Sequence, residues 1–285
     1  RALRRRSRST VAVRSLRFAL AGAAALVEGA VALALIFAND RNDNPWLTAA
    51  VAVTAGLSFV AAGLVALWRR PENTTGFLLS ATGYLWFLGA LGESNSPWVW
   101  TVGFVAGNLA FLAFAALILA YPGGTLGRRD RWLVAIAGLA AIGANAVGAL
   151  VDETPVTGCP RCPRSAIAVT DRPGVKDAVV LVATVVIVGM LLAVFAILAD
   201  RWRRASVAQR RTLRPVFVSC GIALALLLAA VLTDRIDSRA YSAVWVLFLL
   251  AFAAVPLTFL AGVLRSRLDR AAEHAVDQLV DQVQP

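Results

Sequence analysis

The chain has 285 residues, of which 59% are hydrophobic and 16% charged, and its formal net charge is +11. Globular domains are about one quarter charged, and the mean hydropathy here is +0.71, so a soluble domain of this length would lack enough polar surface to cover itself. Long apolar stretches alternate with short arginine-rich breaks, which excludes one large soluble core and indicates a polytopic membrane protein.

Eight apolar runs are long enough to cross a bilayer, which takes roughly 17 to 25 helical residues. They are Phe18–Phe37, Trp46–Trp68, Gly76–Gly92, Trp98–Tyr121, Trp132–Val151, Ala178–Ala199, Val216–Thr233 and Tyr241–Leu264. None of them contains Lys or Arg. We therefore predict an all-α fold: a basic cytoplasmic segment at 1–17, an eight-span transmembrane helical bundle at 18–264 and a cytoplasmic linker helix at 265–285.

The placement of the basic residues predicts the orientation of this bundle. Of 28 Lys and Arg residues, 21 lie in the N-terminal segment, in every second loop and in the tail after Leu264, and the other four loops share seven. By the positive-inside rule we expect both termini in the cytoplasm and the protein in the plasma membrane. The positive net charge is thus explained by the retention of arginine-rich loops on the cytoplasmic side of the membrane. We therefore expect no nucleic-acid partner.

The N-terminal run does not read as a secretory signal. Residues 18–37 form a run of 20, and no small-residue cleavage site leads from it into a soluble domain. The chain has no initiator Met and stops at Pro285 within a helical pattern, so we expect it to be a piece of a longer protein.

The one acidic residue within a span is Glu28, at position 11 of 20 in the first, near the expected bilayer midplane. Because no span contains Lys, Arg or His, we expect its carboxyl to be protonated unless it lines a wet cavity. Asn108 in the fourth span has a matching depth and can hydrogen-bond it, whereas Asn145 in the fifth span is less well matched. Two interpretations stay open: a switch sensitive to protons or a ligand, and a neutral hydrogen bond that only holds helices together.

Gly103 and Gly107 form a G-x-x-x-G pattern in the fourth span. Such a pattern allows close approach of a neighbouring helix or of a second subunit. Sequence alone does not choose between these two contacts.

Cys159 and Cys162 form a C-P-R-C motif in the expected extracytoplasmic loop 152–177. Oxidising conditions there permit a local disulfide, and the alternative is a redox- or metal-responsive pair. A structural zinc site would need four ligands. Cys220, inside the seventh span, is expected to be a small packing residue.

Catalytic chemistry is not indicated in this chain. The only histidine is His274 in the tail, and no Gly-rich phosphate-binding loop is present. We therefore expect no catalytic residue, no metal and no cofactor site within these residues.

The tail favours a continuous helix. Apolar residues recur at spacings of three and four, while charged residues occupy the other side; the apolar set is Leu268, Ala272, Val276, Leu279, Val280 and Val283. The last span is thus expected to continue as one helix over 241–283, roughly 65 Å at 1.5 Å per residue. Its apolar stripe invites pairing with a second copy, or else lies on the membrane surface. His274 precedes Ala275 and not an acidic residue, which disfavours a phosphoacceptor histidine.

Five short elements stand in the loops and the tail. They are Arg69-Arg70-Pro71-Glu72-Asn73 up to Gly76, Tyr121-Pro122-Gly123-Gly124-Thr125-Leu126, Cys159-Pro160-Arg161-Cys162-Pro163-Arg164, the basic run Arg201 to Arg214, and Leu264-Arg265-Ser266-Arg267-Leu268. In this order and spacing, over about 70 to 270, they resemble the membrane sensor region of actinobacterial sensor histidine kinases. Ser165 stands where such regions often have Asn, and the tail after Arg270 departs from the usual continuation.

The resemblance implies a two-component receptor whose membrane bundle senses a stimulus. A cytoplasmic dimerisation and ATP-binding module, absent from this chain, would autophosphorylate and pass phosphate to a response regulator, with ATP needed only there. It also implies a homodimer, and it carries no catalytic residue onto this sequence. The alternatives are a small-solute transporter, disfavoured by the few polar groups at midplane depth, and a membrane anchor for another output domain.

Overall fold

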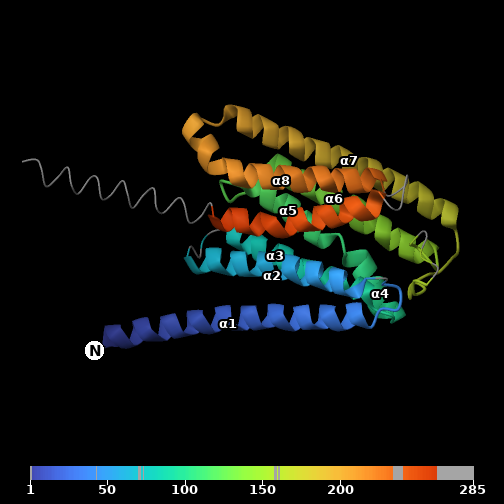
Figure 1. Cartoon of the computed structure of the whole chain (residues 1–285), viewed down its shortest axis with the longest axis horizontal. Helices are drawn as coiled ribbons and strands as arrows, with labels where there is room; N and C mark the ends of the chain where they lie inside the picture. Colours follow the sequence, from blue (N-terminus) through green and yellow to red (C-terminus); the bar gives the residue numbers. More distant parts are fainter. Residues whose placement is uncertain are drawn as a thin grey trace, which may run out of the picture.

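The computed structural model describes residues 2–42, 44–69, 72, 74–156, 159, 161–233 and 240–261, with side chains from residue 14 onward except at 208, 209, 211 and 212. Within these ranges the regular structure is helical, without a strand. The helices are α1 (Ala2–Phe37), α2 (Pro45–Arg69), α3 (Thr74–Gly89), the 3-10 turn η1 (Ala90–Glu93), α4 (Pro97–Ala106), α5 (Leu109–Ala120), α6 (Arg128–Val151), α7 (Pro173–Arg204), α8 (Val207–Thr233) and a last helix at Ala240–Ala261 (Figure 1).

Eight stretches of the described residues are helical, long and apolar enough to cross a membrane. They are Arg14–Phe37, Pro45–Arg69, Thr74–Glu93, Pro97–Ala120, Arg128–Val151, Pro173–Arg204, Leu213–Thr233 and Ala240–Ala261. Each one overlaps a span predicted from the sequence, so the predicted all-helical class and the number of spans are confirmed. This architecture is that of a multi-pass membrane protein.

The outermost helices are longer than the predicted spans. α1 begins at Ala2, so the basic segment is helical and continuous with the first span, because no Gly or Pro precedes Gly22 to end the helix. α7 begins at Pro173, a residue that suits the first turn of a helix, and therefore starts before the predicted Ala178. The predicted continuation of the last helix over 262–283, with His274 and the linker segment 265–285, lies outside the described residues.

The fourth span differs most from the prediction. The sequence predicts one run over Trp98–Tyr121, but the structure contains two helices, α4 and α5, interrupted at Gly107 and Asn108. Gly is a weak helix former and Asn competes for backbone hydrogen bonds, so both residues favour an interruption. Two positions near the middle of an otherwise apolar span are thus not part of either helix.

Gly103 of the G-x-x-x-G pattern packs against its own chain. A Cβ on Gly103 would lie 2.0 Å from the backbone N of Gly92 and 2.4 Å from the carbonyl carbon of Leu91, so the α4 and η1 backbones are in direct contact. Gly107 lies beside Gly89 at the same helix contact: a Cβ on Gly89 would lie 3.6 Å from the Gly107 Cα. The pattern serves a contact between neighbouring helices of one bundle, as small residues do in membrane proteins.

The last helix occupies the centre of the bundle. Its Phe252 is fully buried, and its ring centroid lies 4.5 Å from that of Phe59 in α2, 4.9 Å from that of Phe114 in α5 and 5.2 Å from that of Trp86 in α3. In Figure 1 this helix, drawn in red, runs between α8 and the α2–α3 pair. α1 lies at the edge against α2, with Leu26 63% exposed. Aromatic rings of three other helices therefore pack against the last helix.

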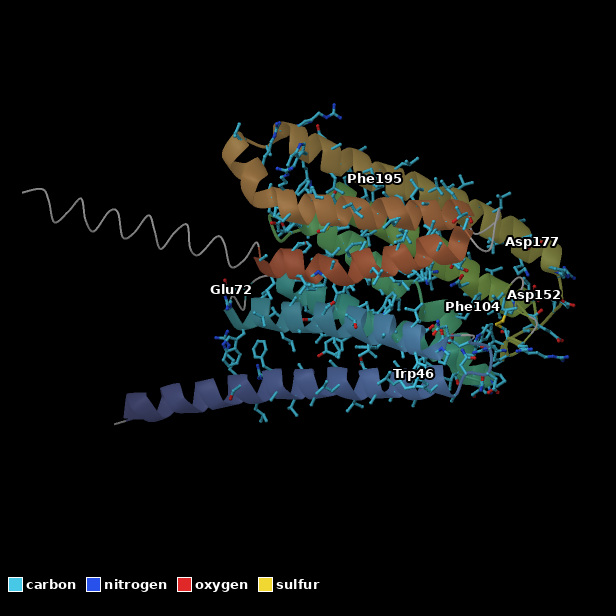
Figure 2. The ribbon with its side chains drawn as sticks, viewed as in Figure 1. Trp46, Glu72, Phe104, Asp152, Asp177 and Phe195 are labelled. Atoms are coloured by element: carbon cyan, nitrogen blue, oxygen red, sulfur yellow. A yellow bond between two sulfur atoms is a disulfide. The ribbon has the colours of Figure 1, made fainter. Side chains whose placement is uncertain are left out.

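The loops gather at two ends of the bundle. The end that carries Arg69, Arg128, Arg201 and Arg214 is called the basic end, and the end that carries the loop 152–172 is called the disulfide end. Figure 1 places the start of α1 at the basic end, and Figure 2 places Glu72 there and Asp152 at the opposite end. Among the described residues, the arginine-rich loops thus lie at one end of the bundle and the disulfide loop lies at the other.

Candidate functional site

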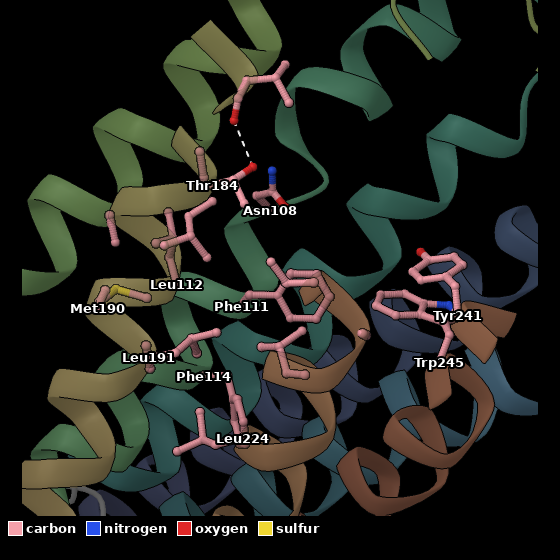
Figure 3. Close-up of a pocket in the computed structure, with 18 residues that line it drawn as sticks. Asn108, Phe111, Leu112, Phe114, Thr184, Met190, Leu191, Leu224, Tyr241 and Trp245 are labelled. Atoms are coloured by element: carbon pink, nitrogen blue, oxygen red, sulfur yellow. Dashed lines mark hydrogen bonds between the residues drawn. The ribbon is translucent and has the colours of Figure 1, made fainter. Parts of the chain in front are cut away.

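A cavity of about 320 Å³ lies among α5, α6, α7, α8 and the last helix (Figure 3). Its wall is mainly aliphatic and aromatic, with Asn108 and Thr184 as polar groups at one end of the view. The Thr184 hydroxyl donates to the Val180 carbonyl oxygen at 2.7 Å, as Ser and Thr do in membrane helices. The volume falls at the lower end of the range for small-molecule sites, about 300 to 1,000 Å³, and the lining suits a mainly apolar ligand.

The last helix forms one wall of this cavity. Tyr241 and Trp245 stack with ring centroids 5.9 Å apart, and Trp245 meets the edge of Phe111 from α5 at 6.2 Å. One turn further on, Phe248 is fully buried in the core. A molecule in the cavity would therefore touch the helix that occupies the centre of the bundle.

A second cavity of about 300 Å³ lies among α2, α3, η1, α5, the last helix and the end of α1. The two cavities share Phe111 and Trp245, so these two rings stand between them. Gly107 lines the second cavity and Asn108 lines the first. The interruption of the fourth span is thus located where the two cavities adjoin.

Asn145 of α6 stabilises this interruption. Its side-chain amide donates to the Phe104 carbonyl oxygen at 2.7 Å. The last carbonyls of a helix lack the backbone donors that continue the ladder, and in hydrocarbon they need another partner. Asn145 therefore has a structural role at the end of α4. The sequence did not indicate this role, because Asn145 was considered only as a partner for Glu28, whose depth in the bilayer it matches less well than Asn108 does.

We expect Asn145→Ala to destabilise the bundle by about 1 to 2 kcal/mol, because the Phe104 carbonyl loses its donor. Unfolding in detergent micelles by added SDS, followed by circular dichroism, measures this loss. Leu139→Ala is the control, since Leu139 lies on the same helix and is 78% exposed. Equal effects of the two substitutions would contradict the role assigned to Asn145.

Glu28 and Asn108 are not brought together. Glu28 is half-buried in α1, which packs against α2, α3 and η1. Its Oε2 atom is buried without a hydrogen-bond partner among the described residues. Asn108 lines the cavity beside α6 and α7 instead, because α2 and α3 stand between α1 and α5. The expected hydrogen bond between the two side chains does not form.

Cys159 and Cys162 form a disulfide, with their Cα atoms 5.4 Å apart. The surrounding loop is fixed by hydrogen bonds between side-chain hydroxyls and the backbone. The Ser165 hydroxyl donates to the Ala149 carbonyl at 2.6 Å, and the Ala166 N–H donates to the Thr101 hydroxyl at 3.0 Å. The disulfide loop is thereby attached to α4 and to the end of α6.

A buried ion pair closes the same loop. Lys176 Nζ lies 2.6 Å from Asp152 Oδ2, and the two side chains are only 9% and 7% exposed. Burial alone would raise the pKa of the Asp152 carboxyl, but hydrogen bonds from Lys176 and the Thr154 N–H, together with the Lys176 charge, lower it below its usual value. The sequence analysis did not identify this pair. One signal was present: Lys176 is the only lysine among 28 basic residues.

Arg201 connects three spans at the basic end. Its Nη1 donates to the carbonyl oxygens of Leu119 and Tyr121 at 2.8 Å each, and its Nη2 lies 3.1 Å from Asp130 Oδ2. The guanidinium thus satisfies carbonyls at the end of α5 while it pairs with the first turn of α6. Arg201 was recognised in the sequence only as part of a basic run.

The described residues contain no group of three or more His, Cys, Asp and Glu side chains that could hold a metal ion. Cys220 is 1% exposed in α8 and belongs to the apolar core. Comparisons with family models, with curated proteins and with solved structures gave no match.

Proposed function

We propose that this chain is the membrane sensory region of a two-component sensor histidine kinase, and that the cavity beside Asn108 and Thr184 holds a small, mainly apolar ligand. The last helix then carries the change to a cytoplasmic kinase module. One observation carries the proposal: the helix that contributes Tyr241 and Trp245 to the cavity wall also contributes Phe252 to the centre of the core.

The packing supports transmission along this helix. Closely packed interfaces have few alternative arrangements, so a small displacement in the cavity favours movement of the whole helix. Ser58 donates to the Ala253 carbonyl at 3.2 Å, and the hydroxyls of Ser219 and Thr258 are 2.8 Å apart, so the helix is held to α2 and α8. A ligand shifts such an equilibrium only as far as its affinities for the two arrangements differ.

The loops supply the second line of support. The five elements that resemble sensor kinases, together with the gathering of arginines at one end, favour a bundle with its basic end in the cytoplasm. The homodimer, the response regulator and the use of ATP by the kinase module are parts of the same proposal. The disulfide loop would then face the extracytoplasmic side, where the disulfide is stable.

Filling the cavity tests the proposal. In the full-length protein with its output module, Ala141→Leu is expected to change the autophosphorylation rate by about fivefold or more, because the added side chain occupies the ligand volume. Ala135→Leu on the exposed face of α6 is the matched control. An unchanged rate in Ala141→Leu, or a coding sequence that continues into a module other than a kinase, would overturn the proposal.

A solute transporter is the second candidate, favoured by the interrupted fourth span. Interrupted helices at membrane depth often form substrate sites in transporters, and here the interruption adjoins two cavities that share Phe111 and Trp245. Counterflow of labelled apolar solutes in proteoliposomes distinguishes the candidates. Accelerated exchange would favour a transporter, whereas binding without exchange is expected for the sensor.

A further inference from the structure

A third hollow lies on the outer side of the bundle, between the C-terminal half of α7 and the middle of α8. It measures about 350 Å³ and is lined by Phe195, Leu198, Ala199, Trp202, Arg203, Phe217, Val218 and Gly221. Figure 2 shows Phe195 on α7, away from α1. Val218 is 51% exposed, and a Cβ added to Gly221 would meet no atom within 4 Å. This apolar groove is therefore open to the surrounding lipid.

Arginines surround the groove where it reaches the basic end. Arg203 lines it, is exposed, and has no ion pair among the described residues. Arg214 is exposed and lies on α8 one turn before Val218, on the same face as the groove. Two carboxylates of the described residues at this end are already paired, Asp200 with Arg204 at 2.9 Å and Asp130 with Arg201 at 3.1 Å. The positive charge at this rim is thus not neutralised by the described part of the chain.

Arg210 is held in place beside the groove. Its guanidinium lies 5.8 Å from the Trp202 ring centroid, and it donates from Nε to the Trp202 carbonyl at 3.1 Å and from Nη2 to the Arg203 carbonyl at 2.8 Å. These contacts fix the turn between α7 and α8 and place a third positive charge at the rim. An apolar groove with a cationic rim is complementary to a phospholipid with a net negative charge.

We infer that this groove binds one anionic phospholipid, with an acyl chain along Leu198, Phe217 and Gly221 and the phosphate beside Arg203 and Arg214. The inference needs only that the bundle crosses a membrane, so it stands apart from the sensory role. Aromatic side chains such as Trp202 favour the headgroup region, which agrees with the phosphate lying at this depth. The site would distinguish phospholipids by the charge of the headgroup, and it would not exclude any of them by the length of the acyl chain.

Native mass spectrometry of the purified chain in detergent tests this site, with phosphatidylglycerol and phosphatidylcholine of identical acyl chains as probes. We expect one phosphatidylglycerol to bind about tenfold or more tightly than phosphatidylcholine. The double variant Arg203→Gln and Arg214→Gln is expected to lose this preference, while the pair Arg128→Gln and Arg129→Gln, at the same end but outside the groove, keeps it. Gly221→Leu fills the groove and is expected to weaken binding of the one phosphatidylglycerol by about tenfold.

Gly189→Leu is the control for that substitution, because a Cβ on Gly189 in α7 also meets open space but lies outside the groove. Three results would each overturn the inference. They are equal binding of the two lipids by the wild type, an equal loss in both arginine pairs, and an equal effect of the two leucines. Circular dichroism of every variant establishes that it is folded.

Discussion

Replacing Gly103 by alanine is expected to destabilise the bundle by about 3 kcal/mol or more, the upper end of the cost of overpacking. The added Cβ would lie 2.0 Å from the Gly92 backbone N and 2.4 Å from the Leu91 carbonyl carbon. Backbone atoms have no rotamer to move into, so α4 and η1 must separate. Denaturant unfolding in micelles and the yield of folded protein measure the effect.

Gly143→Ala is the matched control for this substitution. Gly143 lies within α6, where an added Cβ meets no atom within 4 Å, and alanine is the better helix former by about 1 kcal/mol. We expect that variant to be as stable as the wild type or slightly more so. A Gly103→Ala protein as stable as the control would show that α4 and η1 are not in direct backbone contact.

Replacing Asp152 by asparagine is expected to cost about 3 to 5 kcal/mol, because Lys176 would stay buried without its counter-ion. The loss is measured by unfolding in micelles and by protease sensitivity of the loop 152–172. A second change, Lys176→Met in the same chain, should recover most of the stability, since the uncompensated charge is then removed. No recovery in the double variant would contradict this account of the pair.

The same pair predicts a pH dependence with a definite sign. The folded-state pKa of Asp152 is lowered from its usual value of 3.8, so the pair contributes fully above that value and loses its contribution as the pH falls through the lower folded value. Stability due to this pair is therefore expected to be constant between pH 5 and pH 8. A loss of stability between pH 5 and pH 8 that occurs in the wild type but not in the double variant would contradict the assignment.

Several features of the fold follow from sequence alone because bilayer thickness and charge impose them. Runs without Lys or Arg predicted the eight spans, and the arginine-rich breaks predicted which loops share an end. Gly103 was recognised as a contact residue, but its partner is the chain's own η1. The elements were predictable because each one depends mainly on its own residues and on the membrane.

The candidate site was not predictable in the same way. Asn108 and Glu28 have matching depths, yet depth gives no position around the bundle axis, and α2 and α3 separate the two helices. Asn145 was ranked lower by depth, although it is the residue that satisfies the Phe104 carbonyl. The pair of Lys176 in α7 with Asp152 at the end of α6 was missed, because a lone lysine in the sequence does not show which carboxylate lies beside it.

The sequence by itself determined that the chain is helical, that it has eight apolar spans and that arginine-rich loops alternate along the chain with loops that carry fewer arginines. These properties depend on helix length, hydropathy and charge, which are local. Only the tertiary structure decided that the last helix lies at the centre, that the fourth span is interrupted beside two cavities, and that Phe111 and Trp245 stand between them. Those properties depend on which faces of the helices pack together, and in spans that are apolar on almost every side hydropathy does not specify the packing faces.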